Sequence, residues 1–239
     1  MKRRIIFYLI LGVCVFAVLC GPGYRDIVTT VRQISDQPVI LIDPGHGGMD
    51  GGAESSDGVS EKDINLDISL LLKNELQKQG MRVMMTREED KGLYDESPGA
   101  AVRTLKTEDM KKRKRIIDET MPDLCVSVHM NSFTEDQGVR GAQVFYPSEG
   151  DEKLTACSKE AAAIMQKALN AGVNKAGSRS ELGKNDVFLL RNITCPIIIV
   201  ECGFLSNPGE VKKLSDSGYQ RKISKVIAGS IAEYTQKKR

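Results

Sequence analysis

The only two histidines of this chain each follow a short apolar run, and this placement suggests metal chemistry. His46 stands in the glycine-rich turn 44–48 after the run 39–42, and His129 follows the run 124–128. A lone histidine is more often structural than metal-binding. In open α/β sheets, however, ligands collect beyond the carboxyl ends of parallel strands, so the two imidazoles could meet there. Two histidines still make an incomplete metal site.

Glu61 is the best candidate for a third ligand. It follows Ser60, which we expect to cap a helix that has Asp63 at its third position, so the first helical turn would orient the Glu61 carboxylate. A His/Glu/His set leaves one tetrahedral position open for water, as in catalytic zinc sites. Thiolates and all-oxygen cages are absent from the set, which disfavours other metals. The sequence therefore predicts Zn²⁺ bound by His46, Glu61 and His129.

A hydrolytic zinc site also needs a base, and Glu201 is the candidate. It ends the apolar run 197–200, where partial burial would raise its pKa toward the useful range. Taken singly, Asp43 and Glu201 are as often hydrogen-bonded strand-end carboxylates as functional ones. We therefore leave Asp43 between a structural role and that of orienting His46. Arg87 and Arg191 could meet substrate carboxylates, although such arginines are more often surface or capping residues.

The glycines around His46 do not form a nucleotide-binding motif. From Gly45, the dinucleotide pattern G-x-G-x-x-G requires glycine at position 50, which is Asp50, and no Gly-Lys-Ser/Thr follows for a phosphate-binding loop. What the glycines supply is backbone freedom and space around an imidazole.

The elements that must position these residues alternate as in an α/β layer fold. We expect strands at 39–42, 81–86, 124–128, 142–146 and 197–200, and helices at about 64–76, 102–119, 153–171 and 219–235. No Gly/Ser-rich or Pro-rich linker divides residues 38–239, so we expect one domain there.

The N-terminus predicts export. Lys2, Arg3 and Arg4 precede an uncharged run over 5–20, as in a signal peptide. The run 5–19 would extend about 22 Å as a helix, short of the roughly 30 Å hydrocarbon core, which slightly favours a cleaved signal over an anchor. We assign residues 1–24 to an export signal or membrane anchor that contacts the membrane, and 25–37 to a stalk. The body then lies outside the cytoplasm.

Charge and cysteine content exclude other classes of protein. Without Lys2, Arg3 and Arg4, 31 of the 34 basic residues remain against 32 acidic ones, so no affinity for nucleic acid is implied. We interpret the basic run 111–115 as a solvated helix face, because acidic residues flank it, rather than as a lipid-binding patch. Four cysteines remain in the body without C-x-x-C spacing, and free thiols are at least as expected as disulfides.

Several motifs together resemble one enzyme family. In order, they are I-D-P-G-H-G-G-x-D-x-G-A, E-K-D-x-N-L-D, S-V-H-x-N-S, R-G-A-Q-V-F-Y and I-V-E-C-G-F-L-S-N. Over about residues 39–234 the chain resembles the zinc-dependent N-acetylmuramoyl-L-alanine amidases of the amidase-3 type. The resemblance implies a single three-layer α/β domain, with a mostly parallel twisted sheet flanked by helices on both faces. It places the family's zinc ligands on His46, Glu61 and His129, and its catalytic glutamate on Glu201.

The implied reaction is hydrolysis of the amide between N-acetylmuramic acid and L-alanine in peptidoglycan. Small members without a wall-binding domain, as here, resemble the germination-specific amidases of spore formers. This subtype implies cortex maturation with muramic lactam formation, and localisation in the intermembrane space of a forming spore. A bare catalytic domain must find its substrate through its anchor or through a partner, so an activating protein is a candidate partner. The alternative is an exported zinc-containing module that binds peptidoglycan without turnover.

Overall fold

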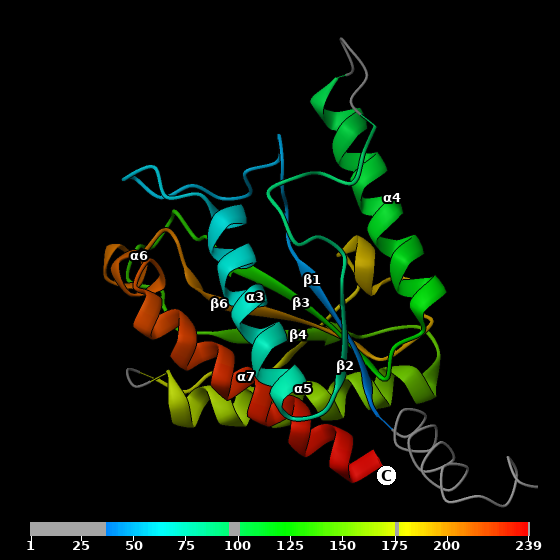
Figure 1. The fold of residues 1–239 in the computed structure, drawn as a ribbon. Helices are drawn as coiled ribbons and strands as arrows, with labels where there is room; N and C mark the ends of the chain where they lie inside the picture. The colour runs from blue at the N-terminus through cyan, green and yellow to red at the C-terminus, as the bar shows by residue number, and fades with distance from the viewer. Residues whose placement is uncertain (1–36, 96–100, 175–176, 239) are drawn as a thin grey trace, which may run out of the picture. The chain divides into compact units, whose positions relative to one another are not determined.

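A central six-stranded sheet organises the protein. The computed structural model describes residues 37–95, 101–174 and 177–238. The strands are β1 (Val39–Pro44), β2 (Arg82–Met85), β3 (Leu124–Asn131), β4 (Gln143–Pro147), β5 (Leu182–Lys184) and β6 (Ile197–Phe204). The helices are α3 (Glu61–Lys78), α4 (Val102–Thr120), α5 (Glu152–Gly172), the short 3₁₀ helix η1 (Phe188–Leu190), α6 (Pro208–Leu214) and α7 (Ser217–Lys238) (Figure 1).

The sheet is mixed and mostly parallel, as predicted. Its strand order is β2-β1-β3-β6-β4-β5. Strands β2, β1, β3 and β6 are mutually parallel, whereas β4 runs antiparallel to β6 and parallel to β5. The five expected strands and four long helices are present. Sequence patterns did not predict β5 and α6, because three and seven residues are too few to show a period.

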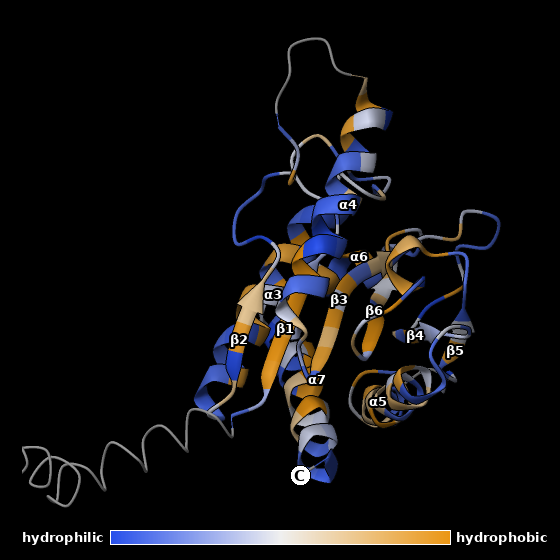
Figure 2. Ribbon diagram, turned by 90° about the vertical axis from the view of Figure 1, so that its right-hand side faces the viewer, coloured by the Kyte–Doolittle hydropathy of each residue, from blue (hydrophilic) through white to orange (hydrophobic). Residues whose placement is uncertain are grey.

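Alternation along the central strands sends side chains into two separate cores. Ile40, Val126 and Val200 face the larger core, which is closed by α3, α5 and α7. Leu41, Cys125 and Ile199 face the smaller core, which is covered by α4 and η1. Helices therefore pack on both faces of a single α/β domain. In Figure 2, β1, β3 and β6 are mainly hydrophobic, as strands buried on both faces should be.

His129 and Glu201 lie within paired strands, whereas His46 follows the end of β1. Strands β1, β3 and β6 are each longer than the apolar run that predicted them, because backbone pairing continues past that run. Pro44 pairs with Val128, and His129 pairs with Glu201. A β-bulge follows in β3–β6, where Asn131 next pairs with Phe204. Bulges often aim side chains next to active sites. Here the bulge lies directly after His129 and Glu201.

Two further sequence predictions concern the N-terminal segment and the cysteines. The export signal or anchor at 1–24, and the stalk up to residue 36, lie outside the described residues. Among the helices of the described residues, none has the length and apolar content needed to cross a membrane. The four body cysteines, at positions 125, 157, 195 and 202, are free thiols.

Candidate metal centre and active site

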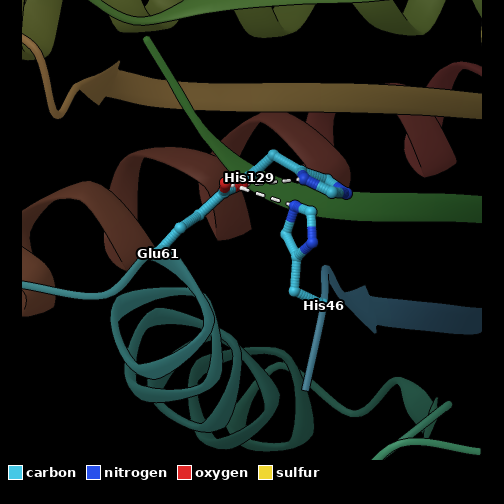
Figure 3. A group of neighbouring side chains, drawn as sticks. All are labelled: His46, Glu61 and His129. Atoms are coloured by element: carbon cyan, nitrogen blue, oxygen red, sulfur yellow. Dashed lines mark hydrogen bonds and ion pairs between the residues drawn. The ribbon is translucent and has the colours of Figure 1, made fainter. Parts of the chain in front are cut away.

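His46, Glu61 and His129 come together at the carboxyl ends of β1 and β3, facing the first turn of α3 (Figure 3). One donor atom from each lies within 4.8 Å of the others. Glu61 stands between the histidines, with Oε2 3.2 Å from His46 Nε2 and Oε1 3.0 Å from His129 Nδ1. Two imidazoles and one carboxylate are a donor set that suits zinc. The structure thus brings together all three ligands that the sequence predicted.

Two glycines are required for this close approach. A Cβ atom on Gly45 would lie 2.2 Å from Cε1 of His129, and one on Gly52 would lie 2.4 Å from Oε2 of Glu61. Gly52 also has a φ of +70°, a conformation that L side chains rarely adopt. His46 itself has a φ of 61°. The expectation that glycines make space around the imidazole is borne out at the atomic level.

Side chains beyond the three donors fix their orientation. Asp50 Oδ2 lies 2.8 Å from His46 Nδ1, so this imidazole can donate there and present the Nε2 lone pair to a metal. Asp50 is in turn paired with Lys106 of α4 at 2.7 Å. Asn65 donates to Glu61 Oε1 at 3.3 Å. The sequence patterns pointed to no role for Asp50 or Asn65, although each stands four positions after the candidate ligand that it supports.

The electrostatics of the cluster favour a cation between these groups. Burial opposes charge on His46, but its hydrogen bonds with Asp50 and Glu61 outweigh this effect and raise its pKa to about 9. Burial likewise opposes ionisation of Glu61, yet the two histidines hold its pKa well below the usual range. The two carboxylates therefore stabilise positive charge where the donor atoms meet. A divalent metal ion would satisfy the same requirement.

Glu201 lies on β6 directly beside His129, its register partner on β3. The residue is half-buried. Its Oε2 atom, however, is shielded from solvent and has no hydrogen-bond partner among the described residues. Burial raises the pKa of Glu201 to about 7; His129 acts against the rise, and the negative charge of Glu61 adds to it. An unpartnered carboxylate oxygen with a near-neutral pKa is equipped to accept and return a proton.

Comparisons with known proteins agree with this geometry. A family model described as N-acetylmuramoyl-L-alanine amidase (Amidase_3) matches residues 40–233. The chain belongs to this amidase family. The amidase is a hydrolase that cleaves the N-acetylmuramoyl-L-alanine bond of peptidoglycan.

Individual relatives extend the match. The amidase is 34% identical to the germination-specific N-acetylmuramoyl-L-alanine amidase of Bacillus subtilis, covering 84% of this chain and 81% of that protein. It is 39% identical to the CwlD amidase of Clostridioides difficile, solved in complex with the GerS lipoprotein, with a TM-score of 0.79 over 84% of this chain and 99% of that one. A second amidase, from Clostridium difficile 630, is 30% identical with a TM-score of 0.73, covering 85% of this chain and 100% of that one.

Asp43 supports the amidase site indirectly. Its side chain is fully buried and accepts hydrogen bonds from Thr86, Ser127 and Arg113. Among the described residues, no hydrogen bond or ion pair joins it to His46. Arg113 provides the link, because it bonds the Pro44 carbonyl at 2.6 Å and the His46 carbonyl at 2.5 Å. The open question about Asp43 resolves toward a structural role.

Three local expectations need correction or a choice. Ser60 precedes α3 but does not cap it with its side chain, because its hydroxyl donates to the Gly51 carbonyl instead. Arg87 is buried and donates to the carbonyls of Pro44 and Gly45, so it is neither a surface residue nor placed to bind a substrate carboxylate. The basic run 111–115 is not wholly solvated. Arg113, at its centre, is 1% exposed and ion-paired with Asp43.

Proposed function

We propose that this amidase is zinc-dependent, with His46, Glu61 and His129 as metal ligands and Glu201 as general base and acid. The observation that carries the proposal is the convergence of the three donors beside the unpartnered Oε2 of Glu201. When bound there, zinc supplies a Lewis acid that polarises a carbonyl and acidifies water.

Glu201 moves the proton that hydrolysis requires. Its Oε2 accepts a proton from the attacking water, whose oxygen bonds to the lactyl carbonyl carbon. The C–N bond then breaks, and Glu201 returns the proton to the departing amine of L-alanine. Burial raises the pKa of Glu201, and a carboxylate with a raised pKa is a stronger base toward the attacking water. Asp50 meanwhile holds His46 in one orientation.

Turnover separates this proposal from the alternative of a zinc-containing module that only binds peptidoglycan. The test is digestion of purified peptidoglycan by the full-length chain with added zinc, followed by mass spectrometry. We expect free stem peptides that begin with L-alanine. Binding of the polymer without release of such peptides would favour the module.

We further propose that the enzyme acts outside the cytoplasm in spore cortex maturation, where its cleavage permits muramic lactam formation. The likeness to the germination-specific amidase supports this role. In this proposal, residues 1–24 direct export or anchor the chain, 25–37 form a stalk, and 38–239 are the catalytic domain. Cortex from a strain lacking the gene should contain no muramic lactam, and a normal lactam content would exclude the role.

A protein partner that activates the enzyme is part of the proposal. The similar CwlD amidase was solved with a lipoprotein bound. Co-purification of the tagged chain from sporulating cells, followed by addition of the captured protein to the cleavage assay, tests the partner. We expect the rate to rise.

A further inference from the structure

A second polar site adjoins the proposed catalytic glutamate. His129, Glu201 and Gln143 are register partners across β3, β6 and β4, so they form one row at the same edge of the sheet. Directly paired residues share a face, which places Gln143 beside Glu201. Gln143 lines a cavity of about 1290 Å³ that extends over the segments 138–141, 173–174 and 177–180 and over α6 and α7. The cavity therefore begins one strand away from Glu201.

The walls of this cavity carry unpaired positive charge. Five cationic side chains line it, and in the described part of the chain none of them forms a salt bridge: Arg140, Arg179, Lys212, Lys213 and Lys222. The two acidic residues of the lining accept backbone hydrogen bonds. Glu210 accepts from the amides of Gly141 and Phe204, and Asp216 accepts from that of Tyr219.

Arg179 is held beside Gln143, the lining residue that pairs with Glu201. It donates to Gln143 Oε1 at 3.0 Å and to the Arg140 carbonyl at 2.8 Å, and it lies 4.9 Å over the ring of Phe204. Among the described residues, no hydrogen bond uses its Nη2. A fixed guanidinium with a free edge is suited to binding a carboxylate.

The distribution of charge on peptidoglycan indicates which part of the substrate this cavity binds. In peptidoglycan, the muramic carboxyl group is consumed in the scissile amide, and its N-acetyl group is neutral, so the glycan strand brings no carboxylate to the site. The carboxylates belong to the peptide that continues from L-alanine. Two strand spacings, from His129 to Gln143, span about 10 Å. An extended peptide covers about 3.3–3.6 Å per residue, so its second and third residues reach the cavity.

Resting on the proposed function, we infer that the cavity between Gln143 and α6–α7 is the subsite for the acidic peptide stem. Arg179 and Arg140 contact the first carboxylate beyond L-alanine. This assignment also orients the substrate, with the peptide over β4 and the glycan strand on the side away from β4.

The test compares two forms of one polymer, native peptidoglycan and the same material with its free carboxylates converted to amides. The full-length zinc-loaded chain should cleave the native form faster. In Arg140→Glu/Lys212→Glu, the apparent kcat/KM for the native form should fall about tenfold, while that for the amidated form changes less than about twofold. Both side chains are exposed, and in the described chain only the backbone carbonyl of Arg140, not its side chain, accepts a hydrogen bond. The milder Arg140→Gln/Lys212→Gln pair guards against misfolding and should give a smaller loss of the same kind.

Lys167→Glu is the matched control, since this exposed α5 lysine lies outside the cavity. It should leave the preference for native polymer unchanged. Equal losses on the two polymers, or no loss on either, would overturn the subsite while leaving the hydrolase intact. If wild-type enzyme released no stem peptide from either polymer, the proposed function would fail, and the subsite with it.

Discussion

Glu61 is fixed between the two histidines by more than the histidines themselves. Its Oε1 accepts the amide of Met130 at 3.0 Å, and its Oε2 accepts the amide of Ala53 at 2.8 Å. Both oxygens are thus oriented by backbone from two other segments. A carboxylate held in this way loses little freedom when it binds a cation. The donor set is therefore preorganised by the chain.

The two glutamates of the site should be separable by mutation. Glu201→Gln preserves volume but removes basicity, and Glu201 is not a proposed ligand. Zinc content should persist while the rate of peptidoglycan cleavage falls about 10²- to 10⁴-fold, the usual worth of general acid–base catalysis. Glu61→Gln should instead lose zinc. Metal analysis paired with the cleavage assay checks both, and near wild-type cleavage by Glu201→Gln would refute the mechanism.

Substitution of a proposed metal ligand should weaken zinc binding more than substitution of Asp50, which orients His46. His129→Ala removes a donor, so most of the zinc should be lost. Asp50→Asn keeps all three donors but weakens the bond that orients His46, and we expect zinc affinity to fall about 10- to 100-fold. Competition with a chromogenic chelator measures both. Full zinc occupancy and activity in His129→Ala would show that the metal lies elsewhere.

At the scale of elements, α4 holds the end of β1 and the following turn, which carries His46, in place. Arg113 reaches from α4 to Asp43 on β1 and is ion-paired with Asp109 one helical turn earlier. The pair is buried, so loss of one partner would leave the other charge unpaired in the core. The position of the turn that carries His46 therefore depends on the packing of α4, although Arg113 follows His46 by about 70 residues in the chain.

This buried pair predicts a stability change in acid. Burial opposes ionisation of Asp43, but Arg113 and the hydroxyls of Thr86 and Ser127 lower its pKa from 3.8 to about 2. Because the folded pKa is depressed, the stabilisation is present above about pH 4 and is lost as pH falls toward 2. Its size is roughly 2 kcal/mol. Urea unfolding across this range should show a shallower pH dependence for Asp43→Asn than for the exposed control Asp57→Asn. An identical dependence in both variants would contradict the argument.

At the scale of the whole molecule, the described sheet and its two cores are complete without the N-terminal segment. Every strand and the residues of both cores lie within 38–239. Deletion of residues 1–24 should therefore leave a soluble enzyme with an unchanged cooperative unfolding transition and the cleavage rate of the full-length chain. Circular dichroism and the cleavage assay check this. A truncated chain that fails to fold would show that the segment belongs to the core rather than to export.

The sequence by itself predicted the proposed donor set and general base, and it located most of the elements around them. His46, Glu61, His129 and Glu201 could be selected because each follows or begins a strongly patterned segment, and such patterns reflect local burial and periodicity. The same patterns located the long helices and five strands. The family motifs, which quote these residues in order, pointed to the same amidase.

Tertiary structure decided what depends on pairing between distant segments. Arg113 belongs to a basic run that resembles a solvated face, and only the packing of α4 against β1 buries it beside Asp43. Strand order places Gln143 next to Glu201, although 58 positions separate them in the chain. The cationic cavity likewise gathers side chains from three separate segments. Local periodicity carries no information about such neighbours, because they are set by the register of the sheet and by which face each helix covers.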